Sequence, residues 1–359
     1  MPRKMLITGA TGLVGGYFLA RMLRNTDADI VVIARPKPKH TAEERINNIL
    51  RYFGISSCQP RMKVLAGDIT EPRCGLSDLT VNSISDGLTD IFHAAADLSF
   101  DKSRTETLVE TNIKGTENVL QLCPSDTRLF YVSTAYIAGS THGDFSESDV
   151  DCGQSFNNDY EKTKCLAEKM VRDYFRGSDE LLTIMRPSII TGEYTSGKTF
   201  QFAGFYTVLR VLYSLANSKL PKTIYLPYIP ECTKNFIPVD CLSDMIEEIF
   251  TTQKLWGTTY NLVNESPVSQ FEMQTLFSEV LGLNIRNDDP SLALRPHNAA
   301  LLESIDWYTA YLQNEPSFQC DNRNKLASSK VQMQFDRKYL ETILAFCVQK
   351  RWRHSHAVC

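Results

Sequence analysis

The sequence predicts a doubly wound α/β fold, in which a parallel sheet is covered by helices on both faces. Short apolar segments alternate with amphipathic ones along the first half of the chain, as in successive β-α-β units. A glycine-rich turn, Thr8-Gly-Ala-Thr-Gly-Leu-Val-Gly15, directly follows the first apolar segment. A chain of 359 residues is long enough for two domains, or for one large α/β unit with an appended lobe.

We expect strands where the apolar segments are short and helices where the pattern is amphipathic. The predicted strands are Lys4–Thr8, Asp29–Ala34, Met62–Ala66, Asp90–Ala94, Arg128–Ser133 and Leu181–Arg186. The predicted helices are Gly16–Arg24, Ala42–Tyr52, Thr105–Leu122 and Tyr160–Phe175. Two later strands, Asn235–Val239 and Thr258–Val263, are expected to return to the same sheet after an excursion through about residues 195–233.

The order of these elements predicts two lobes with a cleft between them. A Rossmann domain of residues 1–194 and about 234–264 is expected to bind the dinucleotide. A smaller, mostly helical substrate lobe would comprise about residues 195–233 and 265–359. Its C-terminal segments 306–312, 318–321 and 335–340 are expected to form a small helical cap.

Charge and composition exclude several functional classes. The net charge of −4 and the isoelectric point near 5.9 give no basic field for nucleic acid or an anionic membrane. No apolar segment reaches the roughly 18 to 20 residues that a membrane span needs, and the first residues do not resemble a signal peptide. We therefore expect a cytoplasmic protein whose partner is a small molecule or a carrier protein.

Ten cysteines are scattered along the chain without any CxxC pair. This pattern indicates reduced thiols and no metal site, and a disulfide framework is the less favoured alternative. The cysteines are Cys58, Cys74, Cys123, Cys152, Cys165, Cys232, Cys241, Cys320, Cys347 and Cys359.

The glycine-rich turn indicates a site for a dinucleotide. Glycines lack a Cβ, so backbone N–H groups and the N-terminus of the next helix can approach a pyrophosphate. The residues expected there are Gly9, Thr11, Gly12, Leu13, Val14 and Gly15. Where an NAD-preferring site would carry an acid, after the second strand, the sequence has Arg35 and Lys37. Their charges favour the 2′-phosphate of NADPH, and a solvated cationic loop is the alternative.

Three further segments are expected to line the same site. They contribute Asp68 and Ile69 after the third strand, Ala94, Ala95 and Ala96 after the fourth, and Pro187, Ser188 and Ile189 after Arg186. Asp68 can meet the adenine amino group, or it can be only a turn residue. The alanines let the nicotinamide ribose come close, and the backbone after Arg186 can orient the carboxamide. His93 is interpreted as a packed core histidine, since no catalytic partner stands beside it.

Tyr160 and Lys164 are the candidate reacting groups. Four residues apart on a helix, they share one face, so the ammonium can lower the pKa of the phenol. Hydride transfer to a carbonyl needs a proton donor and a second hydrogen-bond donor at its oxygen. Thr134, at the end of the apolar strand that precedes this helix, can supply the second hydroxyl. The alternative is an exposed Tyr/Lys pair on a charged helix.

In this order along the chain, the glycine turn, the Ser133-Thr134 pair and Tyr160 with Lys164 resemble the extended branch of the short-chain dehydrogenase/reductase family. Within it, the sequence looks like the fatty acyl-CoA reductases and the thioester reductase domains of carboxylic acid reductases and peptide synthetases. The segments that carry this similarity lie within residues 1–265, at 35–45, 92–96, 112–116, 132–136, 186–190 and 235–240.

The resemblance implies a reaction and further residue roles. NADPH would deliver hydride to an acyl thioester carried on coenzyme A or on an acyl carrier protein, supplied by another molecule. Thr134, with Ser133 the lesser candidate, and Tyr160 would stabilise the oxyanion, while Lys164 would bind the nicotinamide ribose hydroxyls. An aldehyde would leave, with further reduction to the alcohol as an option. The resemblance also implies that Asn112 supports Lys164 and that Arg45 joins Arg35 at the 2′-phosphate, although Arg45 can equally be a solvated helix residue.

Three other functions stay open from the sequence. They are a reductase of ketones or aldehydes, a sugar-nucleotide epimerase or dehydratase, and a non-catalytic nucleotide sensor. The basic loop at Arg35 argues against the sugar-nucleotide enzyme, and the presence of Thr134, Tyr160 and Lys164 argues against the sensor. The apolar helix around residues 200–213 can line an acyl tunnel or form lobe core.

Overall fold

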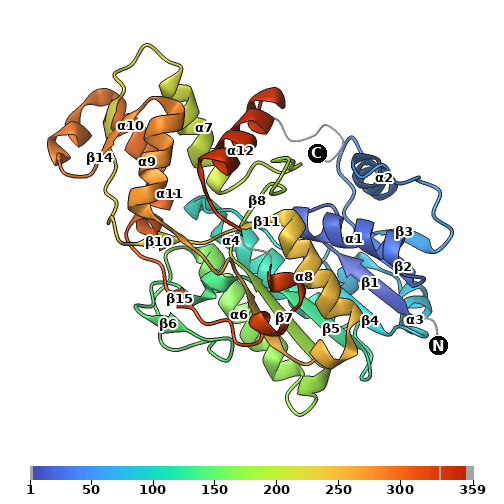
Figure 1. Cartoon of the computed structure of the whole chain (residues 1–359). Coiled ribbons are helices and arrows are strands. Elements are labelled where there is room, and N and C mark those ends of the chain that lie inside the picture. Colours follow the sequence, from blue (N-terminus) through green and yellow to red (C-terminus); the bar gives the residue numbers. More distant parts are fainter. Residues whose placement is uncertain (1–2, 331–332, 353–359) are drawn as a thin grey trace.

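A seven-stranded parallel sheet forms the centre of the computed structural model, which describes residues 3–330 and 333–352 (Figure 1). Met1, Pro2 and Cys359, which the sequence expectations include, lie outside these residues. The strands follow the order β12-β7-β5-β4-β1-β2-β3. They are β1 (Lys4–Thr8), β2 (Asp29–Ala34), β3 (Met62–Ala66), β4 (Asp90–His93), β5 (Arg128–Val132), β7 (Leu182–Pro187) and β12 (Thr259–Leu262). The strand order reverses between β1 and β4, and doubly wound folds bind ligands at that point.

Helices cover both faces of the sheet. They are α1 (Leu13–Asn25), α2 (Ala42–Tyr52), α3 (Asp78–Ser85), α4 (Thr105–Leu108), α5 (Gly115–Leu120), α6 (Asp159–Tyr174) and α8 (Val239–Thr251). Side chains alternate along β1, so Met5 and Ile7 pack in the apolar cluster that includes α1, α2 and α8. Leu6 packs in the opposite cluster, with α5 and α6. The expectation of a doubly wound α/β fold is confirmed.

Two predicted helices differ in detail from the observed ones. The helix α1 begins at Leu13 rather than Gly16, because Gly12 in extended backbone already serves as its N-cap. The predicted helix Thr105–Leu122 ends at Leu120 and contains a π-helical segment, η3 (Val109–Lys114), between α4 and α5.

The expectation that residues 235–239 form a strand of the main sheet is wrong. The segment 235–239 does form a strand, β11 (Phe236–Pro238), but it pairs with β8 (Ile189–Thr191) outside the seven-stranded sheet. The main strand β7 ends at Pro187, and the chain continues as β8 outside the main sheet. Because β11 pairs with β8, it also lies outside that sheet. In contrast, β12 joins the edge of the main sheet beside β7, as predicted.

A second apolar core lies outside the sheet and is rich in aromatic side chains. It is formed mainly by α7 (Phe205–Ala216), α9 (Gln270–Leu281), α10 (Pro296–Ser304), α11 (Asp306–Thr309) and α12 (Arg337–Gln349). Short strand pairs join it, namely β9 (Thr223–Tyr225) with β14 (Asn284–Arg286) and β10 (Thr233–Lys234) with β13 (Val268–Ser269). The expected cap is only partly helical, because β15 (Ser317–Phe318) is a strand beside β6 (Asp144–Phe145). The domain boundaries stay a prediction.

Within the described part of the chain, no helix combines the length and the apolar character required to cross a bilayer.

Candidate active site

The glycine turn between β1 and α1 lies against the segment that follows β4. Gly9 has a φ of +78°, and a Cβ placed on it would lie 2.4 Å from the backbone nitrogen of Ala95. A Cβ on Gly15 would lie 2.4 Å from the carbonyl oxygen of Gly9. Neither position has room for a side chain, so only glycine lets the turn pack this closely against the segment after β4 and against the start of α1.

One cavity of about 360 Å³ opens on one side of this turn. Arg35, Lys37 and Arg45 all line it, so three cationic side chains meet where the sequence predicted a 2′-phosphate. Arg45 is only 8% exposed and donates hydrogen bonds to Thr11 Oγ1, at 3.1 Å, and to the carbonyl oxygen of Arg35. The alternative that Arg45 is a solvated helix residue is therefore wrong.

Asp68 lies in the same cavity and forms an ion pair with Arg35, with 3.4 Å between Nη1 and Oδ2. Its other oxygen accepts hydrogen bonds from the backbone and side chain of Thr70, so the turn role is confirmed. The predicted residues that line this cavity are Gly9, Thr11, Gly12, Arg35, Lys37, Arg45, Asp68, Ile69, Ala94, Ala95 and Ala96.

A second cavity of about 250 Å³ continues from the first, and Gly12, Ala94 and Ala96 line both. Ser188 Oγ is buried here without a hydrogen-bond partner among the described residues, which fits a polar ligand group beside it. The predicted residues that line this cavity are Gly12, Leu13, Val14, Gly15, Ala94, Ala96, Ser133, Thr134, Tyr160, Lys164, Pro187, Ser188 and Ile189. The pair of cavities therefore fits a dinucleotide that crosses the glycine turn.

Thr134 and Tyr160 come together in the second cavity from different elements. Thr134 follows β5 and caps the short helix η4 (Ala135–Ala138), where its Oγ1 accepts the Tyr136 N–H at 3.2 Å. Tyr160 lies in the first turn of α6, which begins at the cap residue Asn158. Burial raises the pKa of the Tyr160 phenol well above its usual value, and a hydrogen bond with Thr134 acts in the opposite direction.

Lys164 lies one helical turn after Tyr160 and is 2% exposed. Its Nζ donates hydrogen bonds to Tyr131 Oη and to the Val132 carbonyl oxygen, both at 2.8 Å. Burial lowers the pKa of Lys164 to about 7, while the carboxylate of Glu168 acts to raise it. The side chain of Lys164 is therefore directed to the end of β5. Thr134, rather than Lys164 as we expected, acts to lower the pKa of the Tyr160 phenol.

Asn112 lines neither cavity. It lies in the π-helical segment η3, where its Oδ1 accepts the Asp97 N–H at 2.8 Å and its Nδ2 donates to the Asp97 carbonyl at 3.1 Å. Nδ2 also donates to Thr163 Oγ1 at 3.1 Å, next to Lys164 in the sequence. Asn112 thus fixes the loop after β4 against α6.

His93 is a core histidine, as the sequence indicated. Its ring nitrogens lie 2.6 Å from Thr8 Oγ1 and 3.1 Å from Thr116 Oγ1. Burial lowers its pKa to about 3, so the ring is neutral.

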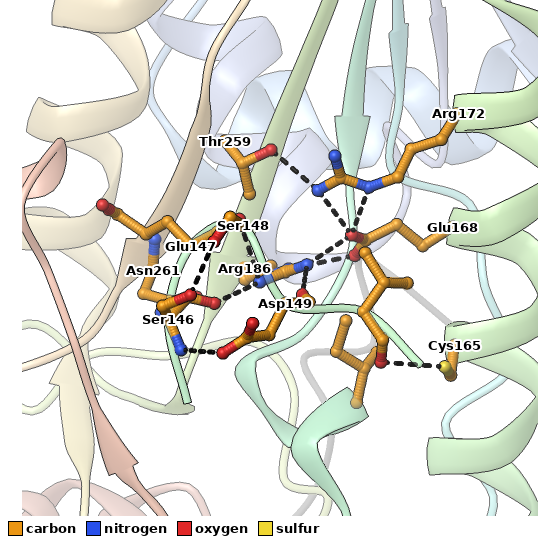
Figure 2. A network of polar contacts seen from close by, with 12 residues as sticks. Ser146, Glu147, Ser148, Asp149, Cys165, Glu168, Arg172, Arg186, Thr259 and Asn261 are labelled. Carbon is orange, nitrogen blue, oxygen red and sulfur yellow. Dashed lines mark hydrogen bonds and ion pairs between the residues drawn. The ribbon is translucent and has the colours of Figure 1, made fainter. Parts of the chain in front are cut away.

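A buried ion pair fixes α6 against the sheet (Figure 2). Glu168, one turn after Lys164, accepts hydrogen bonds from Arg186 of β7 at 2.6 and 3.1 Å, and both side chains are fully buried. Arg172 also donates to Glu168. Arg186 further donates to the carbonyl oxygens of Ser146, Glu147 and Asp149. Burial acts to raise the pKa of Glu168, but the charge and hydrogen bonds of Arg186, together with the charge of Arg172, outweigh it and lower the pKa.

The sequence analysis missed much of the wall of the second cavity. Its unpredicted lining includes Leu98, Phe100, Tyr136, Gln201, Trp307, Tyr308 and Tyr311. The aromatic composition of segment 306–312 was visible in the sequence, but nothing in it indicated that this segment meets the β5 end of the sheet. In the apolar helix around residues 200–213, Phe205 and Tyr206 line the cavity, and Leu209 and Leu212 belong to the second core, so the role in the lobe core is confirmed. The acyl tunnel stays a prediction.

The fold and the site define an NAD(P)-binding protein of the extended short-chain dehydrogenase/reductase class. More narrowly, the chain belongs to the Male sterility protein family of NAD-binding domains, whose family model matches residues 7–246.

Curated relatives of this chain are much longer proteins. The "Non-canonical nonribosomal peptide synthetase cpsA" of Aspergillus campestris is 30% identical over 295 residues, covering 76% of this chain and 27% of that protein. "Nonribosomal peptide synthetase asaC" of Aspergillus flavus is 26% identical over 290 residues, with the same shares covered. The chain therefore spans about a quarter of the length of these relatives.

Solved structures share the fold. The terminal R domain from the myxalamid PKS-NRPS biosynthetic pathway has a TM-score of 0.79 at 24% identity, covering 98% of this chain and 92% of that one. UDP-glucuronic acid 4-epimerase from Bacillus cereus, in complex with NAD, has a TM-score of 0.66 at 16% identity, covering 99% of this chain and 100% of that one.

Proposed function

We propose that this chain is an NADPH-dependent reductase that converts an acyl thioester to an aldehyde. The observation that carries the proposal is the meeting of the Thr134 and Tyr160 hydroxyls in a cavity continuous with the glycine turn. Support for the thioester comes from the relatives, which are named as peptide synthetases. The R domain that shares the fold is likewise part of such a pathway by its name.

NADPH, when bound, supplies the hydride that adds to the thioester carbonyl carbon. Thr134 and Tyr160 donate hydrogen bonds to the carbonyl oxygen as negative charge builds on it. Tyr160 then transfers its proton to that oxygen and regains a proton from solvent, and Lys164 would bind the nicotinamide ribose hydroxyls. The C–S bond of the tetrahedral adduct then breaks and its hydroxyl proton passes to the sulfur, so a free thiol leaves and an aldehyde remains. A second round would give the alcohol.

The preference for NADPH over NADH rests on the first cavity. Arg35, Lys37 and Arg45 line it, and no acidic residue ends β2. Arginine forks suit the oxygens of a 2′-phosphate. Asp68 neutralises part of this charge through its pair with Arg35, so Arg45 and Lys37 contribute the remainder.

The acyl group would arrive on coenzyme A or on a carrier protein.

The cytoplasm is the expected compartment. The nine cysteines within residues 3–330 and 333–352 are all free thiols, which suits a reducing environment.

The test is NADPH oxidation with acyl-CoA and acyl-pantetheine thioesters, with simple ketones, aldehydes and UDP-sugars in parallel. We expect thioester-dependent oxidation with release of one free thiol per NADPH for reduction to the aldehyde, or one per two NADPH when the aldehyde is reduced on to the alcohol. Tyr160→Phe should remove it, whereas Tyr174→Phe, on the exposed end of the same helix, should not. Turnover of ketones or UDP-sugars alone would refute the proposal.

A further inference from the structure

Five aromatic side chains line the cavity beyond the reacting groups and form what we call the aromatic cage. They are Phe100, Tyr136, Trp307, Tyr308 and Tyr311. Phe100 lies edge to face with Tyr160, with 5.8 Å between ring centroids, and stacks on Trp307 at 4.8 Å. Tyr311 lies 5.6 Å from Tyr136 and 5.8 Å from Tyr308. The cage therefore begins at the phenol that would contact the reacting carbonyl.

Buried carboxylates hold two of these rings from outside the cavity. Tyr136 Oη donates to Glu315 Oε1 at 2.7 Å, and Tyr311 Oη donates to Glu161 Oε1 at 2.5 Å. Neither glutamate lines the cavity. Because each phenol oxygen is engaged by its glutamate, the ring carbons are left to form the cavity wall, and the rings are fixed in place.

The charges around the cavity favour a neutral ligand. Among its described lining residues none is acidic. The negative charge of Glu315 is paired with Lys234, whose Nζ lies 3.4 Å from it and is fully buried. A cationic acyl group would thus find no carboxylate on the cavity wall, since Glu161 and Glu315 lie behind Tyr311 and Tyr136.

The size of the cavity favours a compact ligand. A cavity of about 150 Å³ holds one benzene molecule, and the second cavity measures about 250 Å³. It must also take the nicotinamide end of the cofactor, since Gly12, Gly15 and Ser188 line it. The space left suits about one further ring. Phe205 and Tyr206, buried side chains of the second core, form part of the cavity wall.

We infer that the acyl group reduced by this enzyme is compact, neutral and aromatic, of the size of a phenylacetyl group, and that the aromatic cage selects it. This inference rests on the proposed thioester reduction and adds its substrate class. Edge-to-face contacts with Phe100 and Trp307 would hold the ring, with the carbonyl beside Thr134 and Tyr160.

The experiment compares kcat/KM for pantetheine thioesters of acetate, phenylacetate and palmitate. In the wild type we expect phenylacetyl to exceed palmitoyl about tenfold or more. Trp307→Ala should lower kcat/KM for phenylacetyl about tenfold and for acetyl less than about twofold. Phe100→Leu should act in the same direction. The matched control is Phe271→Ala, an aromatic residue of the same region that is 60% exposed and does not line the cavity; all three ratios should stay unchanged.

A binding measurement distinguishes an error in the proposed role of the aromatic cage from an error in the proposed reaction. The phenylacetyl amide of aminopantetheine cannot be reduced, and its binding should change tryptophan fluorescence in the wild type but not in Trp307→Phe. Such binding without turnover of any thioester would refute the proposed reaction and support the aromatic cage as a binding site. Preference for palmitoyl or for a trimethylammonium-acetyl thioester would refute the selection of an aromatic acyl group by the aromatic cage. So would a proportional loss with all thioesters in Trp307→Ala.

Discussion

Replacing Glu168 with glutamine should strongly destabilise the protein, because it leaves a buried guanidinium without its counter-charge. Arg186 is fully buried and receives its only carboxylate contacts among the described residues from Glu168. Removing one partner of such a pair costs about 3–5 kcal/mol. The carbonyl oxygens of Ser146, Glu147 and Asp149 still accept from Arg186, so we expect the lower end of that range.

The assay is urea unfolding followed by circular dichroism, with the free energy of unfolding compared between variants. The control is Asp173→Asn, which breaks a pair with Arg176 on the same helix. Those two side chains are 64% and 81% exposed, so the loss should stay below about 1 kcal/mol. A Glu168→Gln variant within about 1 kcal/mol of this control would show that the buried pair does not hold α6, and the reasoning would fail.

Three further predictions concern the site itself. Tyr160→Phe should leave NADPH binding nearly intact and lower kcat about 10²- to 10⁴-fold, since it removes the proton donor; turnover near that of the wild type would show that the phenol is not the donor. Lys164→Met tests the lowered pKa of Lys164: between pH about 7 and 10.5 the unfolded wild type binds more protons at this residue than the folded one, so the wild type should gain stability relative to the variant as pH rises through that window. A stability difference that is constant with pH would contradict it. Arg35→Glu should raise the Kd of NADPH far more than that of NADH, measured by fluorescence titration; equal effects on both would refute a contact between Arg35 and the 2′-phosphate.

The parts of the fold that were predictable from sequence depend on local patterns. Short apolar segments predicted strands such as Lys4–Thr8 with the same bounds that the structure shows, because a strand buried on both faces tolerates no polar interruption. The glycine turn and the Tyr160/Lys164 spacing were recognisable for the same reason, since each is contained within a few consecutive residues.

Features that depend on distant segments were not predictable. The strand at residues 236–238 follows β8 away from the sheet, and only the break at Pro187 explains it. The direction of Lys164 depends on Tyr131, a residue of β5 whose hydroxyl has no sequence signature. The aromatic cage depends on how segment 306–312 packs against α6, and no periodicity encodes such a contact.

The helix α6 connects the reacting groups with the aromatic cage. Its Thr163 bonds to Asn112 and its Glu168 to Arg186, so its position relative to the sheet is fixed from two sides. Its Glu161, next to Tyr160, bonds to Tyr311, 150 positions further along the chain. Because Glu161 and Tyr160 are consecutive residues of one helix, a shift of the cage through Tyr311 would also move the phenol relative to Thr134. If the proposed roles hold, substrate selection and proton donation are mechanically coupled, and a cage variant that moves Tyr311 should change kcat as well as KM.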